Sequence, residues 1–176
     1  MKFTPTELPG AFLVEIEPIE DERGFFARAW DGEAFAAHGL DPALAQCNIS
    51  FNRRKGTLRG MHYQVAPHGE AKLVRCTMGA LLDVIVDLRP DSPTFLRHVG
   101  VELSAANRRA LFVPAGLAHG FQTLVDETEV FYQMSRAFVP GAGRGVRWDD
   151  PAFGIAWPED ERIISERDRL WPDFVP

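Results

Sequence analysis

Lys72–Leu88 reads KLVRCTMGALLDVIVDL and consists of two apolar segments separated by Met78-Gly79. In the second segment the even-numbered positions 82–88 are all Leu or Val, whereas Asp83 and Asp87 fall among the odd-numbered ones. Such alternation with a period of two is characteristic of a β-strand. Glycine is a common turn residue between paired strands, so the stretch predicts two strands joined as a hairpin at Gly79.

Similar short apolar segments recur along the chain, separated by Gly, Pro, Asp and Asn. They are Ala11–Ile16, Arg97–Leu103, Arg109–Val113, Gly120–Val125 and Glu129–Ser135. Helical signals are few: Asp31–His38, with Asp31 as N-cap and Gly39 just beyond its end, and a short piece near Pro158–Ile163. Many short strands with few helices predict an all-β sandwich or barrel. Because no internal repeat or linker is visible, we expect residues 1–176 to form a single domain.

The overall charge restricts the class of partner. The chain has 176 residues and a formal net charge of −6 with no block of like charge. Nucleic-acid binding needs a basic surface and is not expected, whereas a small anionic ligand needs only a local cluster of Arg and Lys.

The apolar stretches are far shorter than the ~20 residues that cross a bilayer, and residues 1–18 contain no signal-peptide pattern. Cys47 and Cys76 form no CxxC motif, so we expect reduced thiols and a cytoplasmic protein.

Two of the five histidines have a suggestive context. His62 lies within Leu58–Gln64 (LRGMHYQ), and His119 follows the turn Pro114-Ala115-Gly116, which would put it at the start of a strand. Metal-binding cupin barrels usually carry two histidines separated by one residue, with a glutamate shortly after. Here Met61 and Tyr63 flank His62, so we expect no metal. The spacing alone leaves His62 as a ligand, a base or a core residue.

Several motifs, in order and with similar spacing, resemble the dTDP-4-dehydrorhamnose 3,5-epimerase family. They are Gly56–Gln64 (GTLRGMHYQ), Glu70–Arg75 (EAKLVR), Val113–Phe121 (VPAGLAHGF), Tyr132, Gly145–Pro151 (GVRWDDP) and Ile164–Asp168 (ISERD). The resemblance implies a cupin-type jelly roll, a homodimer, no cofactor and a nucleoside diphosphate 4-keto-6-deoxy sugar as substrate. It also implies inversion of C3, C5 or both through an enolate. That chemistry needs a base, a group that stabilises the oxyanion and an acid on the opposite face.

The resemblance assigns the catalytic roles to four residues. His62 matches the family's base and Asp168 its carboxylate partner, which would hold the imidazole in one tautomer. Asp83 is a second acidic candidate, although exposure at a sheet edge would also explain it. Lys72 matches the cation beside the keto oxygen, and a solvated lysine at the start of a strand is the alternative. Tyr132 matches the acid, and a core tyrosine is the alternative.

The substrate-binding positions are also carried over from the resemblance. They are Arg23, Phe26, Arg28, Gln46, Asn48, Arg59, His119 and Phe138. Arg59 and Arg23 match ligands of the diphosphate, for which the planar guanidinium is well suited. A turn residue after Asp21-Glu22 is the alternative for Arg23.

Three positions depart from the family's pattern. Arg28 and Gly143 stand where the family has glutamate, and Phe138 stands where it has a tyrosine. Phe138 can still stack on a base, but it has no hydroxyl. The catalytic set is intact and the recognition set is altered, so we expect the same chemistry on a dTDP sugar or on another nucleotide such as CDP.

Two other functions are compatible with the sequence. A 3,4-ketoisomerase on the same scaffold would also begin by moving a proton next to a carbonyl. The second alternative is a cupin that binds a sugar nucleotide or a metal and has no epimerase activity.

Overall fold

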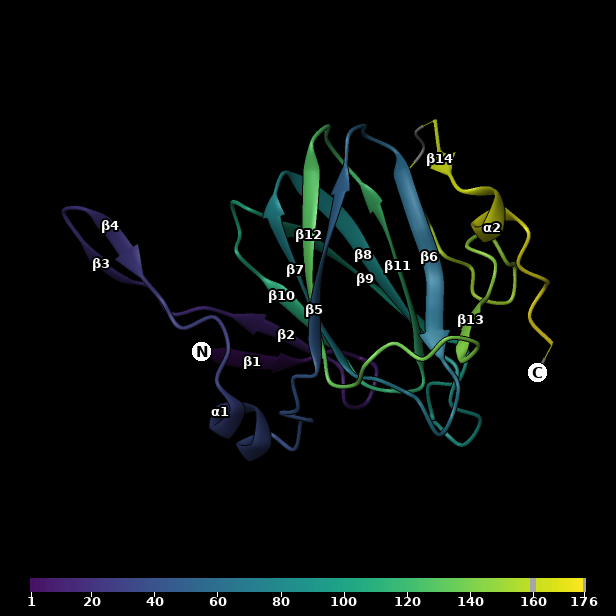
Figure 1. Cartoon of the computed structure of the whole chain (residues 1–176), viewed down its shortest axis with the longest axis horizontal. Coiled ribbons are helices and arrows are strands. Elements are labelled where there is room, and N and C mark those ends of the chain that lie inside the picture. The colour runs from purple at the N-terminus through teal and green to yellow at the C-terminus, as the bar shows by residue number, and fades with distance from the viewer. Residues whose placement is uncertain (159–160, 176) are drawn as a thin grey trace.

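The computed structural model describes residues 1–158 and 161–175, and its framework is a pair of facing β-sheets (Figure 1). The first sheet has six strands, and all of its pairings are antiparallel. In spatial order they are β1 (Lys2–Pro5), β2 (Phe12–Glu15), β10 (Ala110–Val113), β7 (Lys72–Met78), β12 (Thr128–Met134) and β5 (Gln46–Asn52).

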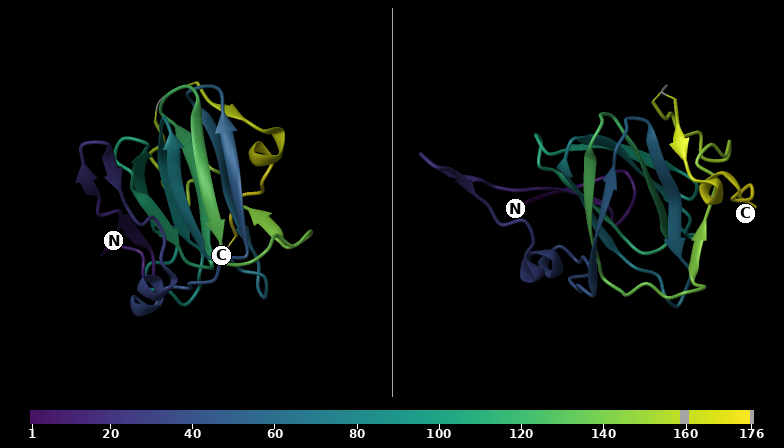
Figure 2. Two further views of the ribbon diagram at one scale, coloured as in Figure 1. Left: turned by 60° about the vertical axis from the view of Figure 1, so that its left-hand side comes forward. Right: turned by 45° about the horizontal axis from the view of Figure 1, so that its top comes forward.

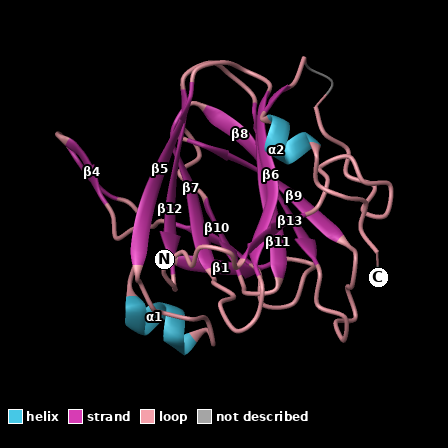
Figure 3. Cartoon of the chain, turned by 45° about the vertical axis from the view of Figure 1, so that its right-hand side comes forward, coloured by secondary structure: helices cyan, strands magenta, loops and turns pink. Residues whose placement is uncertain are grey.

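The second sheet faces the first. Its strands, in spatial order, are β13 (Gly143–Gly145), β6 (Thr57–Gln64), β11 (Leu117–Thr123), β8 (Ala80–Asp87) and β9 (His98–Ser104), and β14 (Ile163–Ile164) runs parallel to β6. The helices of the described residues are short: α1 (Gly32–Ala37) and α2 (Glu166–Arg169), coloured cyan in Figure 3. The arrangement confirms the predicted all-β jelly roll with a few short helices.

Strand β8 shows how alternation builds the core. Leu81 and Ile85 face the space between the sheets and belong to the same buried cluster as Leu111 of the first sheet. Val84 faces the opposite side, where the C-terminal segment covers the second sheet with Trp157 and its neighbours. Both faces of this strand are therefore buried, and the polar residues among the odd-numbered positions point into the molecule.

The predicted hairpin at Gly79 is wrong. Strand β7 pairs with β10 and β12, whereas β8 pairs with β9 and β11, so Gly79 leads the chain from one sheet to the other. A two-residue hairpin turn needs positive φ at its first central position, which Met78 is poorly suited to adopt. Gly79 itself has a φ of +75°, and a Cβ there would lie 2.5 Å from Oγ1 of Thr128. Gly79 therefore lies in the turn that takes the chain from one sheet to the other, not in a hairpin.

Helix α1 follows the prediction. Asp31 caps it by accepting hydrogen bonds from the backbone N–H groups of Glu33 and Ala34, both at 3.1 Å. Gly39 follows with a φ of +71°, and Phe35 packs edge-on against Phe112 at 5.7 Å.

The helix expected near Pro158–Ile163 is not observed in its described part. Residues 159–160 of this segment lie outside the described residues, the flanking Pro158, Glu161 and Arg162 are not helical, and Ile163 begins β14. The helix of this region is α2, which begins after Ser165. The Ser165 side chain caps it by accepting a hydrogen bond from the Asp168 N–H.

Strands β3 (Ile19–Asp21) and β4 (Gly24–Phe26) form a separate hairpin that the sequence did not predict. Figures 1 and 2 show this hairpin extending away from the two sheets. Ile19 and Phe26 are each 70% exposed on it, which is unusual for large apolar side chains. We call Ile19–Phe26 the arm.

Candidate active site

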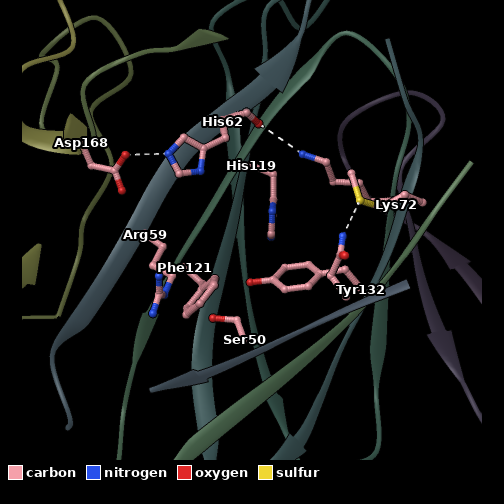
Figure 4. Close-up of a pocket in the computed structure, with 10 residues that line it drawn as sticks. Ser50, Arg59, His62, Lys72, His119, Phe121, Tyr132 and Asp168 are labelled. Carbon is pink, nitrogen blue, oxygen red and sulfur yellow. Dashed lines mark hydrogen bonds and ion pairs between the residues drawn. The ribbon is translucent and has the colours of Figure 1, made fainter. Parts of the chain in front are cut away.

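A cavity of about 320 Å³ lies between the sheets, beside the edge strand β5 and strand β6 (Figure 4). Strands β5, β7 and β12 of the first sheet and β6 and β11 of the second contribute its walls. Seven predicted site residues line it: Asn48, Arg59, His62, Lys72, His119, Tyr132 and Asp168. Residues spread over 121 positions of sequence thus meet at one place.

His62 is held by Asp168. Its Nε2 lies 2.6 Å from Oδ1 of Asp168, whose other oxygen accepts a weak 3.4 Å hydrogen bond from the Gly60 N–H. Burial raises the pKa of Asp168, but the hydrogen bonds to the carboxylate, first that from His62, outweigh burial and hold that pKa below its usual range. Because an ionised carboxylate only accepts, Nε2 carries the proton and Nδ1 of the neutral ring is free to accept one. Figure 4 shows this second nitrogen turned away from Asp168.

Gly145 and Trp171 bring Asp168 within reach of β6. Gly145 of β13 is paired with His62, and a Cβ on Gly145 would lie only 2.2 Å from Cε2 of Trp171. Trp171 follows α2 and is itself covered by the guanidinium of Arg167 at 5.4 Å. The bare backbone at Gly145 therefore lets the C-terminal segment approach β6 closely enough for Asp168 to contact His62.

Lys72 is a buried cation. Its Nζ lies 3.2 Å from Oε1 of Glu70 and donates a long 3.4 Å hydrogen bond to the carbonyl of His62. Glu70 is in turn held by the side-chain amide of Gln64 at 2.5 Å. The side chain of Lys72 is only 10% exposed, so the solvated-lysine alternative does not describe it. The ammonium is fixed at the wall of the cavity, next to His62.

Tyr132 projects into the cavity from β12, opposite Asn48 of β5. Its hydroxyl reaches the neighbourhood of Phe121 and Ser50 (Figure 4). Burial, with a contribution from the charge of Asp83, raises the pKa of Tyr132, while Ser50 and Arg59 act in the opposite direction. The phenol is therefore protonated at neutral pH and available as a proton donor.

His119 has a carboxylate partner of its own. Its Nε2 lies 2.7 Å from Oδ1 of Asp83, and both side chains are almost completely buried. Asp83 is therefore not at a sheet edge and does not partner His62. The ring of His119 lies edge-on to that of Tyr132, with centroids 6.2 Å apart. The sequence contained both residues, but only the pairing of β8 with β11 brings them together.

The polar side chains of the neighbouring strands are also oriented. Arg59 donates from Nε to Oδ1 of Asn52 at 2.8 Å, which holds the guanidinium at the cavity. Asn48 is within 3.2 Å of the sulfur of Met134, which also lines the cavity and was not among the predicted site residues. Phe121 and Ser50 also line the cavity and were not predicted as individual site residues. Once the pairing of β5 and β11 is known, the alternation of side chains along each strand indicates that Ser50 and Phe121 face the cavity.

A second cavity of about 200 Å³ adjoins the first, sharing His62, Lys72 and Met134 with it. Phe138 and Gly143 line this space, and a Cβ on Gly143 would be 3.6 Å from the Phe138 ring. Gln46 is close by, since its side-chain oxygen accepts a 2.8 Å hydrogen bond from the Phe138 N–H. Two further predicted binding positions, Phe138 and Gln46, are thus close to the cavity that His62 lines, together with Gly143, where the family has glutamate.

Arg23, Phe26 and Arg28 do not reach the cavity of their own chain. Arg23 lies in the turn of the arm and pairs with Asp21 at 2.5 Å, and Phe26 is exposed on the arm. Arg28 pairs with Asp31 at 2.6 Å. Within a single chain these residues are separate from the other predicted binding positions.

Two negative findings apply to the described part of the chain. Residues 1–158 and 161–175 contain no group of three or more His, Cys, Asp or Glu side chains arranged to hold a metal ion. None of the helices in these ranges is long and apolar enough to span a membrane.

The chemical capacity of the cavity follows from these contacts. A histidine with one free ring nitrogen, a fixed ammonium and a protonated tyrosine surround one space. Together they can remove a proton beside a carbonyl group, stabilise the resulting oxyanion and return a proton.

Comparisons with known proteins agree with this chemistry. A family model described as dTDP-4-dehydrorhamnose 3,5-epimerase matches residues 5–175. The enzyme of that name from Shigella flexneri is 41% identical over 176 residues, which are 99% of this chain and 97% of that protein. The solved structure of the Bacillus anthracis enzyme, with TDP and PPi bound, has a TM-score of 0.94 and 40% identity and covers 98% of this chain and 99% of that one.

A related solved structure has a narrower activity in its name. It is ChmJ, a 3'-monoepimerase from Streptomyces bikiniensis in complex with dTDP-quinovose, with a TM-score of 0.89 and 38% identity over 96% of this chain and 86% of that one. The family model and the full-length relatives cover nearly all of the sequence, so the chain belongs to the dTDP-4-dehydrorhamnose 3,5-epimerase family and is an isomerase of this epimerase type.

Proposed function

We propose that the chain epimerises C3, C5 or both in a nucleoside diphosphate 4-keto-6-deoxy sugar, with His62, Lys72 and Tyr132 as catalytic residues and Asp168 orienting His62. The observation that carries the proposal is that His62, with Nδ1 free, lines one cavity with the fixed ammonium of Lys72 and the hydroxyl of Tyr132. Membership of an epimerase family supports the same reaction.

The proposed reaction conserves its protons. His62 Nδ1 takes the proton from the carbon beside the keto group, and the C–H electron pair forms the enolate with its charge on the keto oxygen. The Lys72 ammonium stabilises that oxygen. Tyr132 then donates its proton to the opposite face of the same carbon, which inverts the centre. His62 returns its proton to solvent, and Tyr132 regains one.

Solvent exchange in deuterated water tests the assignment of the base. In wild-type protein, deuterium should enter C3, C5 or both, and NMR of the product identifies which. His62→Ala should abolish the exchange, whereas His38→Ala, which removes a histidine beside α1, should leave it unchanged. Undiminished exchange in His62→Ala would rule out His62 as the base.

We propose a thymidine nucleotide as the carrier, because the two related structures described above hold TDP and a dTDP sugar. The changes at Arg28, Phe138 and Gly143 are the reason to test this directly. A melting-temperature screen with dTDP, CDP, UDP and GDP compares the nucleotides, since a ligand that binds only the folded state stabilises it. The largest shift should occur with dTDP; a larger shift with CDP would reassign the carrier.

We propose that the protein is a homodimer in which the arm of one chain contributes Arg23 and Phe26 to the cavity of the other. The exposed apolar residues of the arm, and of the outer face of β5 at Ile49 and Phe51, support an interface between copies. Arg23 and Phe26 match binding positions of the family but do not reach their own cavity, which a partner's arm would explain.

Mixed dimers test this arrangement. His62→Ala and the double variant Arg23→Ala/Phe26→Ala should each be nearly inactive alone. When they are co-refolded, half of the dimers are mixed and each has one complete site, so activity should return to about a quarter of wild type. No recovery in a sample shown to contain mixed dimers would contradict the exchange of arms. A monomer by sedimentation would contradict the dimer.

We also propose that residues 1–176 act as one domain in the cytoplasm. The two cysteines are unpaired in the structure, which suits a reducing compartment.

A further inference from the structure

Two buried polar atoms without a hydrogen-bond partner among the described residues lie around Tyr132. They are Oγ of Ser50 and Oδ2 of Asp83. Unsatisfied buried polar atoms are uncommon, and each calls for an explanation. Asp83 is held by His119 through its other oxygen, whereas Oγ of Ser50, its single side-chain polar atom, has no hydrogen bond of good geometry.

The register of the first sheet directs Ser50 towards Tyr132. On β5, Asn48 is directly opposite Tyr132 and Ser50 is opposite Val130, so the Ser50 and Tyr132 side chains are diagonal neighbours on the inner face. Figure 4 shows both hydroxyl oxygens on the same side of the cavity, next to Phe121. The Ser50 oxygen makes no hydrogen bond of good geometry among the described residues, but it lies close enough to the Tyr132 hydroxyl to lower the pKa of Tyr132.

We propose that Ser50 is a positioning residue that donates a hydrogen bond to the Tyr132 oxygen as Tyr132 gives its proton to the substrate. The inference rests on the proposed function, in which Tyr132 is the acid. When the proton leaves, the O–H bond of Tyr132 breaks, a C–H bond forms on the sugar, and a phenolate remains in the cavity. A hydroxyl with no other partner can turn to that charge without losing an existing bond.

The surroundings of Tyr132 make such a donor necessary. Burial disfavours the phenolate and raises the pKa of Tyr132, and the carboxylate of Asp83 adds to the effect. Ser50 and the guanidinium of Arg59 act in the opposite direction. His119, the other titratable side chain beside the ring, contacts it edge-on and is engaged with Asp83. A hydrogen bond that strengthens as the charge develops accelerates the step, because it acts on the transition state rather than on bound substrate.

The proposal predicts a change in how the enolate is partitioned. An enolate formed by His62 has two outcomes: His62 returns a deuteron to the original face, which gives exchange with retention, or Tyr132 protonates the other face, which gives inversion. Loss of the Ser50 hydroxyl slows only the second outcome. The ratio of exchange with retention to inversion at each carbon therefore reports on Ser50, and a general loss of structure would lower both together.

The experiment measures this ratio by NMR in deuterated water for wild type, Ser50→Ala and Ser50→Thr. Ser104→Ala is the matched control, because it removes a buried serine hydroxyl from β9, away from the cavity. Ser50→Ala should raise the ratio roughly tenfold, the effect of one charge-assisted hydrogen bond, with KM little changed. Ser50→Thr should return it towards wild type, and Ser104→Ala should not alter it.

The outcomes separate this inference from the proposed function. If wild type neither exchanges nor inverts, the proposed function fails. If wild type epimerises but Ser50→Ala leaves the ratio unchanged, or lowers exchange and inversion equally, the role of Ser50 is overturned. A raised ratio that Ser50→Thr does not reduce would assign the effect to packing and would also overturn it. Melting temperatures of all variants show whether each is folded.

Discussion

His62 of β6 and His119 of β11 are directly opposite each other in the second sheet, and each is bound to its own aspartate. His62 contacts Asp168 at 2.6 Å and His119 contacts Asp83 at 2.7 Å. The side chain of His62 is 40% exposed and that of His119 is 6% exposed. The same pairing thus occurs twice, but only His62 has a ring nitrogen that is readily accessible from the open side of the cavity.

Asp168→Asn should lower kcat by about 10³–10⁴-fold with little effect on KM. The amide can donate to Nε2, so the neutral imidazole would place its proton on Nδ1, where the base must accept one. Steady-state kinetics checks this expectation, with the exposed Asp173→Asn as control. A fall of less than tenfold would show that the orientation of His62 does not depend on Asp168.

Gly145→Ala should displace α2 and reduce activity, because its methyl group would overlap Trp171. Gly143→Ala, two residues earlier on β13, is the matched control, since its Cβ meets nothing closer than 3.6 Å. We expect a loss of kcat of at least tenfold in the first variant and a normal fold in the second. Adding Trp171→Leu to Gly145→Ala should recover part of the activity, and equal activity of both single variants would contradict this account.

Lys72→Met should lower kcat by about 10²–10³-fold, because the enolate oxygen loses its fixed positive charge. The variant should also be less stable, since Glu70 would remain buried without its cation. The double variant Glu70→Gln/Lys72→Met separates the two effects. Its melting temperature should rise above that of Lys72→Met, while its activity should stay low; recovered activity would exclude Lys72 from the chemistry.

Asp87 should make stability depend on acid pH. It is fully buried and accepts hydrogen bonds from Arg89 at 2.8 and 2.7 Å, Ser92 at 2.6 Å and Thr94 at 2.7 Å. Burial raises the pKa of Asp87, but these bonds prevail and leave that pKa well below the usual range. A depressed pKa contributes stability that is complete above the unfolded-state pKa of about 3.9 and is lost as pH falls through the folded-state value.

Asp87→Asn should therefore destabilise the protein by about 2–3 kcal/mol at pH 7. The difference in melting temperature between wild type and the variant should shrink below about pH 4, as wild type loses the same contribution. Thermal melts from pH 7 to pH 3 measure this, with the exposed Asp91→Asn as control. A difference that is constant over this range would contradict the role of the Asp87 carboxylate.

Local patterns in the sequence predicted the core strands better than the strands that carry the site. Strands such as β8, β10 and β12 have apolar inward positions, and periodicity reveals them. Strands β5 and β6 were not predicted as strands, because their inward positions include Asn48, Arg59 and His62, which face the cavity instead of the core. A strand that lines a polar cavity lacks the apolar alternation from which strands are recognised.

The sequence by itself determined the all-β class and the helix after Asp31, and through motif resemblance it singled out His62, Lys72, Tyr132 and Asp168, which the structure brings to one cavity. These depend on residue type and short-range spacing, which a linear pattern retains. Only the tertiary structure decided which sheet follows Gly79, which histidine each aspartate holds, and that the arm leaves Arg23 and Phe26 away from their own cavity. Those relationships depend on strand pairing between distant segments, and neither local propensity nor periodicity encodes it.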